Sequence, residues 1–191
     1  MPVDSRFLEL CRRRYSVKRF SSRPVERQKL RLCLEAARLA PSAENAQPWR
    51  FVVFDDPDEK DAVANAVFRG VYSHTRPLAR APVLVALLLK QSIVVNQLGG
   101  KVQGTPFQVV DAGIAGEHFV LAATEQGLGT CWIGWFDSRA LLRHLKLSRR
   151  AFRAVCLIAV GYPAGDLKPR ERNRRPLEDI VCWNRPPETP P

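Results

Sequence analysis

The chain has 191 residues, a length at which one domain buries roughly 70% of the surface of its unfolded chain. Hydrophobic residues make up 46% and charged residues 26%, as in average globular proteins, which excludes a wholly disordered chain. The net charge of +11 leaves a nucleic-acid partner open, because basic proteins release counterions from polyanions. The longest apolar run, 81–89, is too short to cross a bilayer, and residues 1–14 lack a signal-peptide pattern, so we expect a cytoplasmic protein.

Hydrophobic spacing and end signals predict both helices and strands in the first half of the chain. Asp4 or Ser5 can cap the first helix, and Pro24 suits the first turn of the second. The acidic run 55–59 marks the beginning of a third helix, because carboxylates complement the positive end of a helix dipole. The predicted helices span about 5–13, 24–39 and 55–69, and the predicted strands span 49–54 and 83–89.

Residues 106–126 show the longest helical pattern, and we expect them to form the central helix. A face of small residues at 112–116 would allow a second helix or an aromatic ring to approach closely. Residues 90–105 have no clean period and fit a lid or an edge segment. The remaining predicted elements are strands at 130–133 and 154–160, helices at 138–145 and 176–181, and a flexible proline-rich tail at 185–191.

Helices outnumber strands in this order, without a regular alternation of strand and helix and without an internal repeat. The order therefore predicts an α+β fold, with residues 1–184 as a single domain. The glycine-rich dinucleotide fingerprint and the P-loop are both absent from the sequence, which excludes the two usual nucleotide-binding devices.

The side chains that bind metals or form disulfides are scattered along the sequence. The five cysteines include no CxxC pair, and the three histidines have no ligand spacing, which disfavours disulfides and metal catalysis. Each cysteine lies in an apolar stretch, so we expect all of them to be buried thiols. Asp111 and Glu117 of the long helix are interpreted as functional carboxylates or, more simply, as buried caps or ion-pair partners. The cysteines are Cys11, Cys33, Cys131, Cys156 and Cys182.

Basic residues gather near both ends of the chain. In the segment 14–20, an extended backbone would project the side chains of Arg14, Ser16 and Lys18 to one side, where they could hold an anion. The run 170–175 repeats this alternation with arginines. The two segments would form one anion site if they meet in the fold. The alternative for each is a solvated basic surface.

The loop 41–49, Pro-Ser-Ala-Glu-Asn-Ala-Gln-Pro-Trp, is the most distinctive segment of the sequence. Its two prolines fix φ and remove two N–H donors, which excludes a helix or a central strand. The loop offers a hydroxyl, two side-chain amides and an indole, and loops held by a scaffold often bind ligands. The alternative is a plain connector with a buried Trp49.

Four motifs taken together resemble the FMN-dependent nitroreductase family. They are Arg-Tyr-Ser-Val-Lys-Arg-Phe at 14–20, the loop 41–49, Gly-Leu-Gly-Thr-Cys-Trp-Ile-Gly at 127–134, and Gly-Tyr-Pro at 161–163 followed by Arg-Asn-Arg-Arg-Pro-Leu at 172–177. They stand in the family's order and span nearly the whole chain. The resemblance implies an α+β homodimer, a central mixed or antiparallel sheet flanked by helices, and FMN at the subunit interface.

The same resemblance assigns residues that bind the cofactor. Those matching the phosphate and ribityl contacts are Arg14, Tyr15 (through its backbone), Ser16, Lys18, Arg172 and Arg174. Those matching the loop that reaches the flavin ring from the partner subunit are Pro41, Ser42, Ala43 and Asn45. Ile133 and Gly134 match the turn near flavin N5 and O4, and Arg76 loosely matches a basic residue beside N1 and O2.

The implied activity is hydride transfer from NADH or NADPH to a small planar acceptor, such as a nitroaromatic or a quinone, by a ping-pong mechanism. Hydride transfer needs no acidic or basic side chain, so no catalytic side chain is assigned. Oxygen-using flavin or ring oxidation, dehalogenation on the same scaffold, and flavin binding without turnover stay open. A basic nucleic-acid-binding protein is the alternative from another class. The motifs favour NAD(P)H and a small acceptor as partners, without nucleic acid or membrane.

Overall fold

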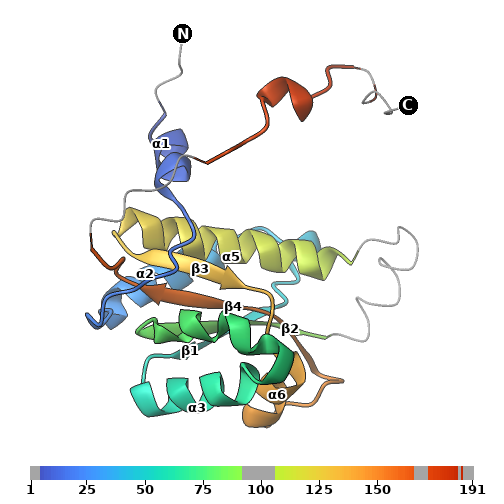
Figure 1. The fold of residues 1–191 in the computed structure, drawn as a ribbon. Helices are drawn as coiled ribbons and strands as arrows, with labels where there is room; N and C mark the ends of the chain where they lie inside the picture. The colour runs from blue at the N-terminus through green and yellow to red at the C-terminus, as the bar shows by residue number, and fades with distance from the viewer. Residues whose placement is uncertain (1–4, 92–105, 166–171, 185, 187–191) are drawn as a thin grey trace.

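Four antiparallel strands, in the order β1-β2-β4-β3, lie at the centre of the protein (Figure 1). The computed structural model describes residues 5–91, 106–165, 172–184 and 186. Every residue of β2 from Val83 to Leu89 is buried, because this inner strand is covered on both faces and can be apolar at each position. The strands are β1 (Trp49–Phe54), β2 (Val83–Lys90), β3 (Gly129–Ile133) and β4 (Phe152–Gly161).

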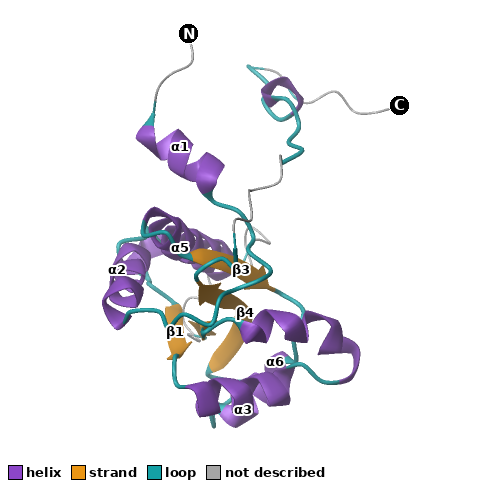
Figure 2. Ribbon diagram, turned by 60° about the vertical axis from the view of Figure 1, so that its left-hand side comes forward, coloured by secondary structure: helices purple, strands orange, loops and turns teal. Residues whose placement is uncertain are grey.

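Helices cover both faces of the sheet (Figure 2). Two helices, α2 and α5, pack on one face, and α3 and α6 pack with η2 on the other. The helices are α1 (Arg6–Arg13), α2 (Arg27–Arg38), α3 (Pro57–Val67), α5 (Phe107–Glu125) and α6 (Ser138–His144), with 3-10 helices η1 (Ala43–Asn45), η2 (Gly70–Arg80) and η3 (Leu177–Asp179). This arrangement confirms the predicted α+β fold, with a sheet that is antiparallel in the described part of the chain.

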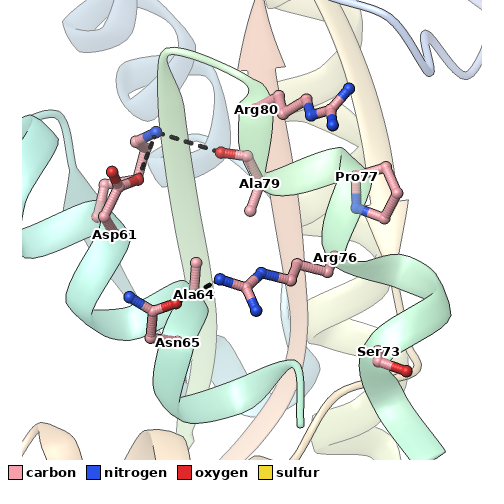
Figure 3. Close-up of a pocket in the computed structure, with 9 residues that line it drawn as sticks. Asp61, Ala64, Asn65, Ser73, Arg76, Pro77, Ala79 and Arg80 are labelled. Carbon is pink, nitrogen blue, oxygen red and sulfur yellow. Dashed lines mark hydrogen bonds and ion pairs between the residues drawn. The ribbon is translucent and has the colours of Figure 1, made fainter.

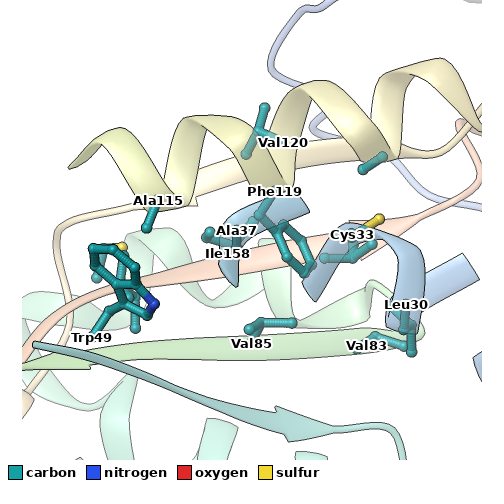
Figure 4. Close-up of a cluster of buried hydrophobic side chains, with 14 of the residues drawn as sticks. Leu30, Cys33, Ala37, Trp49, Val83, Val85, Ala115, Phe119, Val120 and Ile158 are labelled. Atoms are coloured by element: carbon teal, nitrogen blue, oxygen red, sulfur yellow. The ribbon is translucent and has the colours of Figure 1, made fainter. Parts of the chain in front are cut away.

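Each face of the sheet has its own hydrophobic core. Under α2 and α5, Cys33, Phe119 and Ile158 are fully buried, and Trp49 joins them from the start of β1 (Figure 4). The ring of Phe51 stacks on that of Phe119, with the ring centroids 5.9 Å apart. Burying an aliphatic or aromatic side chain of this size contributes about 1.5–3 kcal/mol. The two layers, more than local helix propensity, therefore hold the sheet in place.

The predicted helix starts are confirmed where a polar side chain caps the helix. Ser5, Asp56 and Asp137 each accept a hydrogen bond from a backbone N–H of the first turn, at 3.4, 3.0 and 2.9 Å. The prediction of a helix start at Pro24 is wrong, because α2 begins at Arg27.

Contacts with the end of β4 account for the later start of α2. Glu26 accepts a hydrogen bond of 2.6 Å from the Tyr162 hydroxyl and one of 2.8 Å from Arg23. The Tyr162 hydroxyl is the main cause, ahead of the Glu26 backbone and Arg23, of the lowering of the pKa of Glu26 to about 2. The backbone of Glu26 stays extended under these contacts, so the helix starts at the next residue.

Three other sequence predictions meet the structure differently. The sequence predicted no element for the segment 70–80, which forms η2. Pro77 lies inside this 3-10 helix, and a proline there argues against a helix when only the sequence is read. The prediction of five buried cysteines is wrong, because Cys11 is half-buried and Cys182 is exposed. Cys182 lies in a C-terminal segment in which Leu177, Ile180 and Trp183 are also exposed. The predicted lid (90–105) and tail (185–191) lie almost wholly outside the described residues.

Within the described ranges, no helix has both the length and the apolar character needed to span a membrane.

Candidate functional site

The segment that follows α1 runs as an extended strand along the outer edge of β3. Its Val17 N–H donates to the Thr130 carbonyl at 2.9 Å, and further on Ser21 N–H donates to the Tyr162 carbonyl at 2.8 Å. A side chain at Gly129 would place its Cβ 2.5 Å from Val17 Cγ2, so glycine is needed for this close approach. Val17 is only 1% exposed, whereas Ser16 and Lys18 face outward. The observed alternation is the one that the sequence predicts.

Arginines from both ends of the chain meet beside the last turn of α1. Arg172 donates to the carbonyl oxygens of Cys11 (3.0 Å) and Arg12, which lack partners within the helix. Burial, and then the nearby charges of Arg14 and Arg174, hold the pKa of Arg172 below its ordinary value. The last two effects arise because guanidinium groups at close range repel one another. An anion placed among them would relieve that repulsion.

Glu117 of α5 partly balances this positive charge. Its carboxylate lies 3.9 Å from Arg14 Nε and accepts a hydrogen bond from Trp132. Burial raises the pKa of Glu117, while Arg14 and Trp132 oppose that shift. The Trp132 ring reaches this position across Gly116, where an added Cβ would lie 2.2 Å from the ring. The small face of the long helix thus accommodates an aromatic ring, as predicted, and Glu117 is an ion-pair partner.

Cys131 lies close to the same cations but is a packed strand residue. It is 5% exposed and belongs to the core under α3 and α6. Burial raises the pKa of its thiol, and the positive charges of Lys18 and Arg14 only partly oppose that shift. Because the thiolate is the reactive form, both the burial of Cys131 and this direction of its pKa disfavour a nucleophilic role.

The loop 41–47 is exposed, strained and fixed at one point to α5. Glu44, Asn45 and Gln47 all have positive φ, at 53°, 54° and 45°. Such backbone costs of order 1–3 kcal/mol per residue and persists only where surrounding contacts enforce it. Ser42 Oγ accepts from Gln47 N–H at 3.0 Å, and Asp111 Oδ1 accepts from Ala43 N–H at 3.1 Å. Asp111 is therefore a buried cap, at 4% exposure, for a loop held in an uncommon conformation.

We expect Asp111→Ala to loosen this loop without unfolding the protein. The variant removes an acceptor whose charge-assisted hydrogen bond contributes about 1.5–3 kcal/mol, so amide exchange at Ala43 should accelerate roughly 10- to 100-fold. Hydrogen exchange followed by mass spectrometry measures this, with the amides of β2 as the internal control. Asp111→Asn keeps an acceptor oxygen and should retain most of the protection. Unchanged exchange at Ala43 in the alanine variant would contradict the capping role.

Within one chain, the loop and the arginine cluster attach to different sides of α5. Asp111 and Glu117 are six residues apart on this helix, which places them about 9 Å apart along the axis and about 120° apart around it. The loop is bonded at Asp111, and Arg14 lies against Glu117. The structure thus brings Arg14, Arg172 and Arg174 together but fixes Pro41–Asn45 elsewhere on the helix.

The turn after β3, which contacts η2, contains a glycine with free space around it, Gly134. Gly134 is exposed, and a Cβ built on it would meet no atom within 4 Å. The next residue, Trp135, donates from Nε1 to the Val71 carbonyl at 2.9 Å and accepts at its own carbonyl from Thr75 Oγ1 at 2.8 Å. Ile133 is 2% exposed and anchors the turn in the core. These contacts with η2 could not be predicted from the sequence, because Pro77 hides the helical pattern of that element.

Arg76 projects from η2 toward α3, into a pocket of about 550 Å³ (Figure 3). Its Nη2 donates to Asn65 Oδ1 at 2.6 Å. The guanidinium is therefore engaged with α3, on the core side opposite α2 and α5. The role of Arg76 beside a flavin stays a prediction.

Comparisons with known proteins identify the family of this chain. A model of the nitroreductase family matches residues 11–162. Spy0809 of Streptococcus pyogenes, under an NAD(P)H nitroreductase name, is 30% identical over 92% of this chain and 98% of its own length. A Thermus thermophilus protein named NADH dehydrogenase is 31% identical over 96% of this chain and 98% of its own. An FMN complex from Desulfovibrio desulfuricans, under a nitroreductase name, has a TM-score of 0.76 and 29% identity, covering 97% of this chain and 100% of that one. The chain belongs to the nitroreductase family.

Proposed function

We propose that this protein is a cytoplasmic FMN-dependent oxidoreductase that transfers electrons from NADH or NADPH to a small planar acceptor, such as a nitroaromatic or a quinone, in a ping-pong cycle. Its relatives carry NAD(P)H nitroreductase and NADH dehydrogenase names, and one solved relative is an FMN complex. All five cysteines are free thiols, as is usual in a reducing compartment. The single observation that carries the proposal is the contact between the two ends of the chain, where Arg172 bonds to the last turn of α1 beside Arg14 and within the electrostatic range of Arg174.

The arginine cluster has the chemistry that a phosphomonoester requires. Such a group carries close to two negative charges at neutral pH and offers three strong acceptor oxygens. Arg14 and Arg174 would supply guanidinium donors, while Ser16 and Lys18 would add a hydroxyl and an ammonium from the outward face of the extended segment. Arg172 already donates to α1, so it would add charge and fix the site. The backbone of Tyr15 lies between these side chains and belongs to the same proposed site.

The flavin ring would lie against the turn at Ile133 and Gly134. Bound FMN supplies a two-electron carrier that accepts and returns hydride. The open space at Gly134 leaves its backbone accessible, and an N–H there would stabilise the accepting position. A cation beside N1 and O2 would favour the reduced ring. Lys18 is free of any ion pair in the described part of the chain, whereas Arg76 would first have to leave Asn65.

We also propose a homodimer in which the partner's loop completes this site. Pro41, Ser42, Ala43 and Asn45 would reach the ring from the partner subunit, because within one chain the loop is bonded to another side of α5. Apolar side chains that this chain leaves uncovered support such a contact. Their exposed fractions run from 43% to 81%, and they are Phe7, Leu8, Leu177, Ile180 and Trp183. Residues 1–184 would form one FMN-binding domain in each subunit.

One preparation tests the proposed function. The purified protein should be yellow, release FMN on denaturation, and lose its visible flavin absorbance when NADPH or NADH is added without oxygen. A nitroaromatic or quinone should then restore the absorbance. A yellow protein that neither nicotinamide bleaches would be a flavin binder without turnover. A colourless protein that cannot be reconstituted with FMN, and that binds nucleic acid with a steep salt dependence, would overturn the proposal.

A further inference from the structure

The pocket between α3 and η2 has no role in the site described so far. Its volume of about 550 Å³ lies within the usual range for small-molecule pockets. Figure 3 shows its lining: Asp61 and Asn65 project from α3, Arg76 reaches from η2 to Asn65, and the Arg80 side chain leaves the end of η2 in the direction away from Asp61. Ala64, Pro77 and Ala79 add apolar surface. The pocket is thus concave and partly apolar, with several charged groups on its wall.

Positive charge exceeds negative charge in this pocket. Lys60, Arg76 and Arg80 line it, and Asp61 is the single carboxylate among its lining residues. Lys60 Nζ lies 3.0 Å from Asp61 and donates to the Ala79 carbonyl at 3.2 Å, and its side chain is only 12% exposed. One of the three cations is therefore balanced by Asp61. Two positive charges are left, which matches the charge of a phosphomonoester.

The two arginines are not neutralised within the described residues. Arg76 bonds to Asn65, an uncharged amide. Arg80 is exposed, and the described part of the chain gives it neither a hydrogen bond nor an ion pair. Both guanidinium groups lie at the surface, where water solvates them and a ligand can reach them. A bound anion would supply the missing partner through charge-assisted hydrogen bonds.

The pocket also adjoins the turn at Gly134 through η2. Thr75, next to Arg76 in the sequence, bonds to the carbonyl of Trp135, which directly follows Gly134. Consecutive Cα atoms are about 3.8 Å apart, so the Cα atom of Arg76 lies no more than roughly 11 Å from that of Trp135. A dinucleotide whose nicotinamide lay at Gly134 could extend over this distance to the pocket.

We propose that this pocket binds a phosphomonoester dianion through Arg80, with Arg76 and Lys60 contributing charge. Two sources share this chemistry. The first is the 2′-phosphate of NADPH, which rests on the proposed function and would make the enzyme prefer NADPH to NADH. The second is a separate phosphorylated small molecule or free phosphate, which would bind whether or not the flavin cycle operates.

The kinetic test compares wild-type holoenzyme, Arg80→Gln and the control Arg31→Gln. Arg31 is an exposed arginine of α2 without a described partner, on the other face of the sheet, so both variants lose one charge. Arg76 is left intact because of its predicted place beside the flavin. If NADPH is the source, Arg80→Gln should lower kcat/KM for NADPH about tenfold and leave kcat/KM for NADH and FMN content unchanged. Arg31→Gln should leave both ratios unchanged.

The binding test uses calorimetry with 2′-AMP, inorganic phosphate and adenosine. Wild-type protein should bind 2′-AMP but not adenosine, and Arg80→Gln should weaken this binding about tenfold while Arg31→Gln does not. Phosphate or 2′-AMP binding that depends on Arg80, with unchanged NADPH kinetics, would support the pocket and assign it to the second source. This result remains readable even if the protein does not retain FMN. Absence of any Arg80-dependent phosphate binding would overturn the proposal.

Discussion

Replacing Arg14 and Arg174 together by alanine should abolish FMN retention while the protein stays folded. The two side chains come from opposite ends of the chain and approach the same guanidinium, that of Arg172. Each charge-assisted hydrogen bond to phosphate contributes about 1.5–3 kcal/mol, so losing both should weaken FMN binding roughly 10²- to 10⁴-fold. FMN content after gel filtration, followed by titration of the apoprotein with FMN, measures this loss.

The fold should survive because neither arginine supports the core. Arg14 has an ion pair of 3.9 Å with half-exposed Glu117, and Arg174 donates only to the carbonyl of its neighbour Asn173. The control is the double variant Arg31→Ala with Arg143→Ala, which removes two exposed arginines outside this cluster. Its FMN content should equal that of the wild type. The proposed phosphate site would be refuted if the Arg14 and Arg174 variant kept FMN with unchanged affinity.

Two glycines of α5 provide the sharpest test of packing around the site. Gly116→Ala should destabilise the protein by about 1–3 kcal/mol, because the new Cβ would lie 2.2 Å from the Trp132 ring and overpack a filled contact. Gly113→Ala, one turn earlier on the same helix, meets no atom within 4 Å. That variant should raise the free energy of unfolding by up to about 1 kcal/mol, since alanine is the better helix former.

Urea unfolding of both variants, followed by tryptophan fluorescence, measures this difference. The signal also reports on Trp132, whose displacement would break its hydrogen bond with Glu117. Gly116→Ala should therefore weaken FMN binding as well, since Glu117 pairs with Arg14. If Gly116→Ala and Gly113→Ala have the same free energy of unfolding, the Trp132 ring moves aside without destabilising the protein, and the predicted overpacking is wrong.

Local sequence signals predicted most of the fold because they have local causes. The apolar run of β2 reflects burial on both faces, and the caps Asp56 and Asp137 act within one helical turn. The start of α2 could not be predicted, since Glu26 is held by Tyr162, which lies 136 residues away in the sequence. The helix η2 was missed because Pro77 interrupts its helical pattern, and bonds of Thr75 and Trp135 between distant parts of the chain hold it in place.

Some residues of the candidate site could be predicted from local sequence patterns, and others depend on contacts between distant parts of the chain. The sequence predicted that Arg14, Ser16 and Lys18 share one side of the chain. In an extended backbone, every second side chain points the same way. The link from Asp111 to the loop at Ala43 joins residues far apart in sequence, so the sequence could offer only alternatives for that carboxylate. The pocket of Arg80 left no sequence signal, since it arises from the packing of α3 against η2.

The extended segment at 16–17 has a consequence for the behaviour of the protein without its ligand. β3 is an edge strand, and this segment occupies its outer side through Val17 N–H and the bridge from Ser16 to Thr130. An uncovered strand edge is a template for pairing with other molecules. Because the same few residues carry the proposed phosphate donors, a bound phosphate would also keep that edge closed. Apoprotein would then be the more aggregation-prone form, and cofactor supply would govern how much soluble protein accumulates in a cell.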